Sequence, residues 1–284
     1  MRVTVSFSSR TSRPSPARGR RRALSAALLL PLLIGLAGCG SEDNGSDAAD
    51  GAGGSGGGGG DQPEVTLTVL AAASLTDVFE AAGAEYEAAN PGTTVRFSFA
   101  GSQELVAQLN GGAPGDVLVT ADTQTMEGVA ELTGEPEVIA RNELTIVTPP
   151  DNPAGVTGLA DLADPGLRLV LAAPEVPAGR YGQEILAAEN IDAEPDSLEV
   201  NVRSVLGKVQ LGEADAGLVY VTDAAVAGDE VAVVPIPEDQ NVTAFYPAAT
   251  LNDAANLAAA EDFVAWLTGV TAQELLGAAG FLAP

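Results

Sequence analysis

The chain has 284 residues, of which 13 are basic and 39 are acidic, so its formal net charge is −26. It contains no histidine and one cysteine, so the commonest general base and transition-metal ligand is missing and no disulfide can form within the chain. The acidic excess excludes a nucleic-acid partner, because phosphates require a basic surface.

The first 38 residues are predicted to be an export signal. Seven arginines and no acidic residue lie in this segment, and an uncharged apolar run occupies 23–37. A basic head, a short apolar run and small residues at its end are typical of secretory signals, and the run is short for a membrane span. The motif Leu36-Ala37-Gly38-Cys39 resembles a bacterial lipobox, in which Cys39 is lipidated and becomes the new N-terminus.

Two other interpretations of this segment stay open, namely an ordinary signal peptide with an incidental cysteine, and a signal anchor. Segment 20–25 also leaves open whether export uses the general or the twin-arginine route. Residues 39–63 are mostly Gly, Ser, Asp and Ala, and predict a flexible linker. We therefore expect a protein held at the outer face of the cell membrane by lipid on Cys39. Removal of residues 1–38 leaves six basic and 39 acidic residues, a net charge of −33.

The segment 64–284 alternates between short apolar runs and alanine-rich stretches. In chain order, the first half predicts a strand at 65–71, a helix at 75–89, a strand at 94–99, a helix at 103–109, a strand at 116–120, a helix at 123–132 and a strand at 143–148. The second half predicts a helical turn at 159–162, a strand at 168–172, a helix at 179–189, an extended segment at 198–201, a helix at 202–211, strands at 216–221, 231–234 and 245–251, and helices at 253–268 and 272–279. This alternation is typical of an α/β fold with helices on both faces of mostly parallel sheets.

Several predicted helices begin with residues that favour a helix start. Ser74 and Ser102 each follow a strand, Pro177 precedes Ala178 in a first turn, and Asn201 precedes Val202. The segment 74–77 also resembles a capping box, with Asp77 as its fourth residue. Each helix start offers free backbone N–H groups and a partial positive charge, which together suit an anion. Taken singly, however, each of these serines is more often a structural cap than a ligand contact.

Five segments, in order along the chain, resemble the molybdate-binding proteins of ABC importers: 71–79 (AAASLTDVF), 97–102 (FSFAGS), 112–117 (GAPGDV), 176–181 (VPAGRY) and 217–224 (GLVYVTDA). The likeness extends from about residue 65 to 282. It implies a two-lobed, periplasmic-binding-protein-like (type II) α/β fold with two mixed sheets flanked by helices. Lobe 1 would comprise 64–143 plus 243–284 and lobe 2 would comprise 144–242, with a hinge near Glu143 and Val242.

The resemblance also implies a ligand set and partners. Ser74 and Ser102 would donate from hydroxyl and backbone N–H, Ala178 and Val202 from backbone N–H alone, and Tyr220 from its phenol. Molybdate, and tungstate with it, would be bound as an oxyanion without a direct protein ligand to the metal and without a cofactor. The partner would be the membrane permease of an ABC importer, and the receptor would be a monomer. Without the resemblance, Tyr220 at the end of an apolar strand would be interpreted as a core residue.

The chemistry of these residue types agrees with that ligand. Molybdate is a dianion with four acceptor oxygens, so uncharged donors satisfy it, whereas a carboxylate in contact with it would repel it. Arg180, Arg203 and Lys208 are expected to form ion pairs at the lobe surface rather than to touch the ligand. The large negative charge leads us to expect slower association with a dianion at low ionic strength.

Three other functions are compatible with parts of the sequence. A hydrolase or phosphatase could use the acids near strand ends (Asp116, Asp122, Asp215 and Asp223), but the chain has no Gly-x-Ser-x-Gly motif and no histidine. Of these acids, Asp122 and Asp223 are expected to cap the helices that follow them, so we expect a binding protein and no enzyme. A receptor for sulfate, phosphate or an organic carboxylate stays open as the alternative. A tethered adhesion domain would need exposed aromatic residues, and only 4% of the chain is aromatic.

Overall fold

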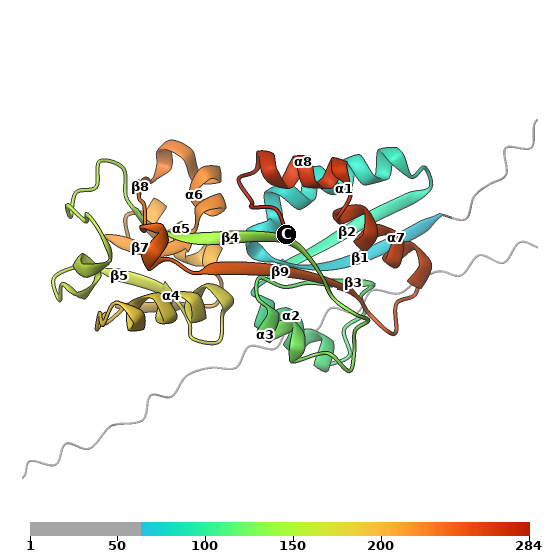
Figure 1. Ribbon diagram of the computed structural model, residues 1–284, viewed down its shortest axis with the longest axis horizontal. Coiled ribbons are helices and arrows are strands. Elements are labelled where there is room, and N and C mark those ends of the chain that lie inside the picture. The colour runs from blue at the N-terminus through green and yellow to red at the C-terminus, as the bar shows by residue number, and fades with distance from the viewer. Residues whose placement is uncertain (1–63) are drawn as a thin grey trace, which may run out of the picture. The chain divides into compact units, whose positions relative to one another are not determined.

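A computed structural model of the protein describes residues 64–284 (Figure 1). The predicted export signal, Cys39 and the linker lie outside these residues. We name residues 64–143 and 243–284 lobe 1, and residues 144–242 lobe 2. The strands β4 (Glu137–Thr148) and β9 (Thr243–Thr250) run between the two (Figure 1). None of the helices in the described part is both long and apolar enough to cross a bilayer.

Lobe 1 is built on a mixed sheet. The strand β1 (Val65–Ala72) pairs in parallel with β2 (Thr93–Ala100) and β3 (Val117–Val119), and β3 pairs antiparallel with β9. On one side of this sheet lie α1 (Thr76–Ala89), α7 (Leu257–Leu267) and α8 (Val270–Ala278), and on the other lie α2 (Ser102–Asn110) and α3 (Thr123–Glu127) (Figure 1). The helices therefore cover both faces, which leaves the carboxyl ends of the parallel strands free to face lobe 2.

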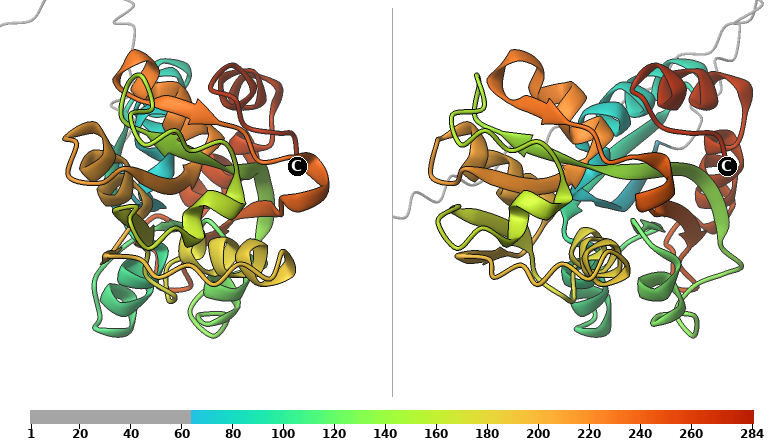
Figure 2. Two further views of the ribbon diagram at one scale, coloured as in Figure 1. Left: turned by 90° about the vertical axis from the view of Figure 1, so that its left-hand side faces the viewer. Right: turned by 60° about the vertical axis from the view of Figure 1, so that its left-hand side comes forward.

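Lobe 2 repeats this plan with other strands. The strands β7 (Ala216–Tyr220) and β8 (Ala232–Val234) both pair antiparallel with β4. On its other side β7 pairs in parallel with β5 (Leu169–Ala172), and β5 pairs in parallel with β6 (Ser197–Glu199). The helices are α4 (Pro177–Ala188), α5 (Val202–Gln210) and α6 (Val221–Ala227), and Figure 2 shows them on both sides of the strands. Short 3-10 turns are η1 (Ala73–Leu75), η2 (Leu159–Ala163), η3 (Gly228–Glu230) and η4 (Glu238–Gln240).

The strand β4 changes partners in its middle. Its first part pairs with β9 as far as Glu143, and from Leu144 onward it pairs with β7 and, nearer its end, with β8. The two expected sheets are therefore joined through β4 into one path, in the order β2-β1-β3-β9-β4-β7-β5-β6. A mixed, two-part sheet with helices on both faces agrees with the predicted fold class.

Two apolar clusters form the core of the described residues, and the larger one includes side chains of both lobes. In lobe 1, Phe79 and Phe263 are completely buried. The rings of Tyr86 and Phe263 pack edge-on, with their centroids 4.9 Å apart. In lobe 2, Val205 and Val219 belong to the same buried set. Each such side chain stabilises the fold by about 1.5–3 kcal/mol on burial, so the lobes are held as firm bodies around the crossing strands.

Several predicted elements differ from those observed. The helix at 123–132 ends at Glu127, and the helix at 253–268 begins only at Leu257. The strand at 143–148 begins six residues earlier, at Glu137, because β9 supplies a partner that is distant in sequence. The strand at 216–221 ends at Tyr220, and α6 begins at Val221, so the helix expected to follow Asp223 begins before this residue and contains it. There, the carboxylate of Asp223 accepts the Tyr220 N–H and turns the chain.

Candidate functional site: a cavity between the lobes

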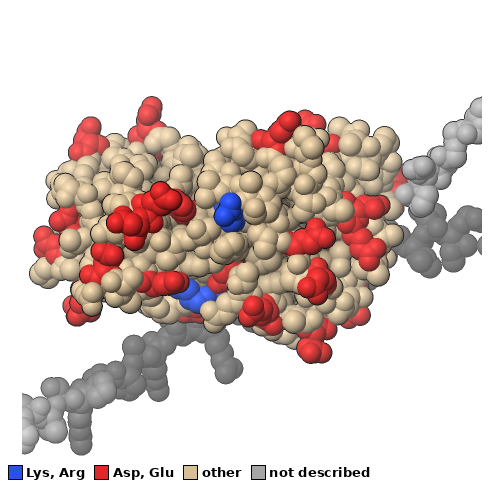
Figure 3. Space-filling view, in the orientation of Figure 1, with Lys and Arg blue, Asp and Glu red and all other residues tan. Residues whose placement is uncertain are grey.

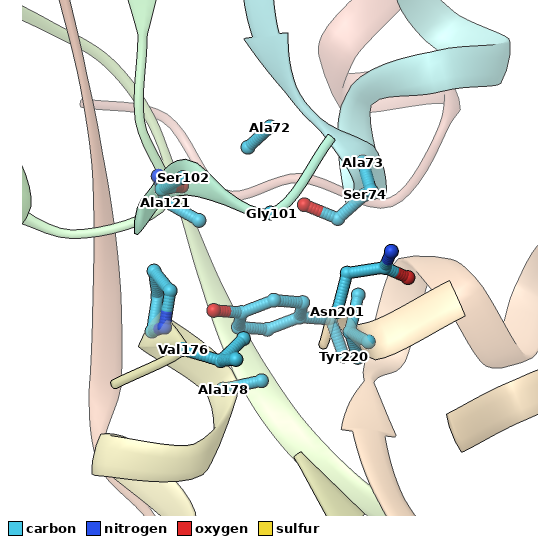
Figure 4. Close-up of a pocket in the computed structure, with 12 residues that line it drawn as sticks. Ala72, Ala73, Ser74, Gly101, Ser102, Ala121, Val176, Ala178, Asn201 and Tyr220 are labelled. Carbon is cyan, nitrogen blue, oxygen red and sulfur yellow. Dashed lines mark hydrogen bonds between the residues drawn. The ribbon is translucent and has the colours of Figure 1, made fainter. Parts of the chain in front are cut away.

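A small cavity, with room of about 10 Å³, lies between the lobes at the ends of their strands (Figure 4). All five residues of the predicted ligand set line it. The complete lining is Ala72, Ala73, Ser74, Gly101, Ser102, Ala121, Val176, Pro177, Ala178, Asn201, Val202 and Tyr220. Figure 4 shows the phenol of Tyr220 between the Ser74 and Ser102 side and the Ala178 side. The structure therefore brings together lining residues that are up to 148 positions apart in sequence.

Three helices begin at this cavity. Ser102 is the first residue of α2, Ala178 the second of α4 and Val202 the first of α5. Backbone N–H groups in a first helical turn have no acceptor within their helix, and the helix dipole places partial positive charge there. Tyr220 is the residue directly before α6, so a fourth helix starts beside the same space. The wall therefore carries partial positive charge without a cationic side chain.

Ser102 has its hydroxyl oriented by the backbone of lobe 1. Its Oγ accepts the N–H of Ala121 at 3.0 Å, and the residue is 1% exposed. Ala121 follows β3 and lines the cavity too. Since this oxygen is used as an acceptor, the hydroxyl proton is the part of Ser102 that is free for a ligand.

Ser74 lies in the 3-10 turn between β1 and α1 and is also buried. Its Oγ is 3.0 Å from Oη of Tyr246, and either atom can donate in that hydrogen bond. The predicted capping box is wrong, since Ser74 does not cap α1 and Asp77 forms an ion pair with Arg203. The turn is closed instead by the hydroxyl of Thr76, which donates to the Ala73 carbonyl at 2.8 Å. The Ser74 hydroxyl is therefore not used to cap the helix.

Tyr220 is the most informative residue of the cavity. Its side chain is buried, and its hydroxyl has no hydrogen-bond partner among the residues that the structure describes. Burial is the main reason why the pKa of this phenol is raised well above its usual value, so it is a neutral donor. A buried hydroxyl without a partner costs about 1–3 kcal/mol. The expectation of an ordinary core tyrosine leaves that cost unexplained, whereas an acceptor in the cavity would offset it.

Charged groups stand behind the cavity rather than in it. Within the described part of the chain, no Asp, Glu, Lys or Arg lines the cavity, although Figure 3 shows acidic side chains spread over the outer surface. Asp122 of lobe 1 pairs with Arg180 of lobe 2, whose Nη1 donates to the Glu175 carbonyl at 2.6 Å. This pair was expected at the surface of one lobe, but it connects the two lobes and is largely buried.

The other basic residues singled out in the sequence are also paired. Arg203 contacts Asp77 and Asp223, each at 2.5 Å, and Lys208 contacts Glu199 at 2.5 Å. None of them reaches the cavity wall within residues 64–284.

The acids considered for catalysis have structural partners. Asp122 caps α3, as predicted, by accepting the Thr125 N–H at 2.8 Å. Asp116 accepts the Thr68 N–H at 2.7 Å, and Asp215 pairs with Arg168. No group of acids, cysteine or histidine suited to a metal ion occurs among the residues searched, 64–284.

Asn201 and Gly101 help to form the wall in ways that differ. The side chain of Asn201 caps α5, as expected, by accepting the Ser204 N–H at 2.9 Å. Gly101 was not singled out from the sequence. A Cβ at Gly101 would lie 2.6 Å from the carbonyl oxygen of Val200 in lobe 2, so the close approach of the lobes requires glycine here. The only sequence signal for it was its place directly before Ser102 in a segment of the resemblance.

Comparison with known proteins adds the family. Residues 67–282 match the bacterial extracellular solute-binding proteins. The molybdate-binding protein ModA of Mycobacterium tuberculosis is 40% identical over 265 residues, which cover 92% of this chain and 98% of that protein. The chain belongs to this family of solute-binding proteins. Within the family it groups with the molybdate-binding proteins.

Solved structures agree with the fold. The periplasmic molybdate-binding protein of Azotobacter vinelandii has a TM-score of 0.65 at 23% identity, with 77% of this chain and 99% of that chain covered. The sulfate-binding protein SubI of Mycobacterium tuberculosis has the same TM-score at 20% identity, covering 76% and 86%. These likenesses establish the periplasmic-binding-protein fold of the family but do not distinguish one oxyanion from another.

Proposed function

We propose that this protein is an extracytoplasmic receptor that binds molybdate, and tungstate with it, in the cavity between the lobes. The observation that carries the proposal is the buried, unpartnered hydroxyl of Tyr220 in a cavity that, as far as the structure describes the chain, has no charged side chain and meets three helix starts. The 40% identity to a protein named for molybdate binding supports this choice of oxyanion. The role is binding and delivery rather than catalysis.

The proposed ligand set is Ser74, Ser102, Ala178, Val202 and Tyr220, as the sequence predicted. Three hydroxyl groups and the backbone N–H groups at the helix starts would donate to the four oxygens of the dianion. Each hydrogen bond to an ionised group contributes about 1.5–3 kcal/mol, and each helix start adds up to about 2 kcal/mol when partly buried. Several such contacts exceed the roughly 8 kcal/mol that corresponds to a micromolar dissociation constant, even after the costs of association.

Discrimination against sulfate would come from size. Sulfate has the same charge and shape but shorter bonds from its central atom to oxygen. Donors held on two firm lobes cannot all follow a smaller ion inward, so some of its hydrogen bonds would be too long. A receptor for sulfate or phosphate is the alternative, and the same titration decides between the two.

Delivery follows from the two-lobed architecture. The lobes would open about a hinge near Glu143 and Val242, where β4 and β9 pass from one lobe to the other, and close on the anion. The partner that receives it would be the permease of an ABC importer. We propose that residues 1–38 direct export and that lipid on Cys39 holds the monomeric receptor at the outer face of the membrane. In cells supplied with a labelled fatty acid, the wild-type protein should then carry the label and a Cys39→Ala variant should not, and equal labelling of the two would contradict the lipid anchor.

The proposal is tested by isothermal titration calorimetry of the purified full-length protein with molybdate, tungstate, sulfate and phosphate in turn. We expect a dissociation constant well below micromolar for molybdate and tungstate and much weaker heat for sulfate and phosphate. Equal or tighter binding of sulfate would transfer the assignment to the alternative, and no heat with any of the four anions would contradict an oxyanion receptor.

A further inference from the structure

The backbone of Tyr220 is hydrogen-bonded to a buried carboxylate. The backbone N–H of Tyr220 donates to Oδ2 of Asp223 at 3.3 Å, and Asp223 is 0% exposed. Burial is the largest effect on this carboxyl and raises its pKa to about 6. A charged Asp223 therefore requires a compensating cation nearby, and a dianion in the cavity would strengthen that requirement.

Arg203 supplies this cation, and its guanidinium group contacts residues of both lobes. Its Nε lies 2.5 Å from Oδ1 of Asp223, as an ion pair without the alignment of a hydrogen bond. Its Nη2 donates to Oδ2 of Asp77 in lobe 1 at 2.5 Å. Arg203 also directly follows Val202, which lines the cavity at the start of α5. One guanidinium thus connects the first turns of α1, α5 and α6.

On the basis of the proposed function, we propose that Arg203 is a positioning residue of the oxyanion site. It balances the charge of Asp223, so that this carboxylate can hold the start of α6, and with it the Tyr220 hydroxyl, beside a bound dianion. Its contact with Asp77 is made between lobes, so the arrangement is complete only when the lobes are together. Arg203 touches no ligand in this role.

The arrangement explains how an anion site tolerates a buried carboxylate one helical turn behind a ligand residue. Without Arg203, the negative charge of Asp223 would repel the dianion and would itself be left buried without a partner, which is strongly unfavourable. A merely structural arginine would affect folding alone. A positioning residue of this kind has a different signature, because removing the carboxylate as well should restore binding.

The test measures molybdate affinity by calorimetry on the full-length protein and its variants D77N, R203M and R203M/D223N. We expect D77N to bind a few-fold more weakly than wild type, because only the contact between lobes is lost. R203M should bind about tenfold more weakly than D77N or worse, since a buried charge loses its partner. The double variant should return to the level of D77N. The matched control is R168M, because Arg168 pairs with Asp215 at 2.5 Å within lobe 2 and away from the cavity, and its affinity should equal that of wild type.

The pH profile gives a second readout. In R203M, lowering the pH from about 8 to about 6 should restore part of the affinity, because Asp223 takes up a proton once its cation is gone. The other ionisable groups that face Asp223 are Asp77, Tyr220 and Tyr246, and burial raises the pKa of both phenols further above this range. R203M/D223N should show no such recovery.

Three outcomes overturn the proposal: R203M binding as tightly as D77N, a double variant as weak as R203M, or a flat pH profile in R203M. If R203M does not fold, the double variant decides, since it must fold and bind like D77N. A wild-type protein that binds no molybdate would remove the proposed function, whereas a wild type that binds while its variants break this pattern would remove only the role of Arg203.

Discussion

At the scale of single residues, the cavity is defined by hydroxyl groups with different duties. Ser102 gives its oxygen to the Ala121 N–H and Ser74 shares a hydrogen bond with Tyr246, while the hydroxyl of Tyr220 has no partner within residues 64–284. Tyr220 is therefore the residue whose contribution to binding can be separated most cleanly from its contribution to folding.

We expect Tyr220→Phe to lower the affinity for molybdate by roughly 1–3 kcal/mol, because one charge-assisted hydrogen bond is lost. The melting temperature of the ligand-free protein should stay the same or rise, because an unpartnered buried hydroxyl is removed while the ring stays in place. Calorimetry and thermal unfolding of the same preparation measure both effects. Unchanged affinity, or a clear loss of ligand-free stability, would assign Tyr220 to the core instead.

The buried carboxyl of Asp223 predicts a pH dependence of stability. Its pKa is about 6 in the folded protein, against the usual 3.8 of an aspartate side chain in water, so the folded state binds the proton more tightly. Its favourable contribution is complete below about pH 4 and is lost as the pH rises through about 6, a change of up to roughly 3 kcal/mol. Asp223→Asn keeps an acceptor for the Tyr220 N–H and should flatten this dependence in denaturant unfolding. An identical slope in both proteins would contradict it.

At the scale of elements, sequence patterns located most helices and strands but missed what depends on distant partners. The half of β4 before Glu143 was missed because β9, about a hundred residues later, pairs with it. The start of α6 was expected too late because Val221 resembles the end of a strand, whereas the helix begins there and the Asp223 carboxylate accepts the Tyr220 N–H. The capping box predicted at 74–77 does not form, because Asp77 pairs with Arg203 of the other lobe.

The candidate site was predictable to the extent that it consists of helix starts. Ser74, Ser102, Ala178 and Tyr220 could be singled out because each lies in a segment shared with a known family, and Val202 because it follows Asn201 at a predicted helix start. All five line one cavity. The pairing of Asp122 with Arg180 could not be predicted, because the spacing of apolar residues indicates helices and strands but not how two lobes are placed relative to each other. The same holds for the close approach at Gly101.

The start of α2 provides a test at this scale. Gly101→Ala would place a Cβ 2.6 Å from the Val200 carbonyl oxygen, so the lobes could not come fully together. We expect about a tenfold or larger loss of molybdate affinity with little change in the stability of ligand-free lobe 1. Gly207→Ala is the matched control, because a Cβ there meets nothing within 4 Å, and in a helix it should stabilise by about 0.5–1 kcal/mol without affecting affinity. Equal affinities in the two variants would refute the close-approach argument.

At the scale of the whole molecule, the strong negative charge has to be reconciled with a dianionic ligand. Charge on the surface acts on the approach of the ligand, over a distance of about 8 Å at physiological salt. Contacts in the cavity act on its release. Affinity can therefore be set by neutral donors even though acidic side chains are spread over the face of the molecule that Figure 3 shows.

This separation predicts that molybdate associates more slowly as the ionic strength falls, because repulsion between protein and dianion is less screened. Stopped-flow measurement of tyrosine or tryptophan fluorescence on mixing would give the rate at several salt concentrations. Association rates independent of salt, or faster at low salt, would show that the ligand does not experience the overall charge.

The central claim is that neutral donors at meeting helix starts hold a metal oxyanion between the two lobes. The most direct measurement is a crystal structure of the full-length protein grown with molybdate, with the metal located by its anomalous scattering. We expect one molybdenum atom in the cavity, with its oxygens within hydrogen-bond distance of Ser74, Ser102 and Tyr220 and no cationic side chain in contact. Molybdenum bound elsewhere, or held by Arg180 or Arg203, would contradict the account.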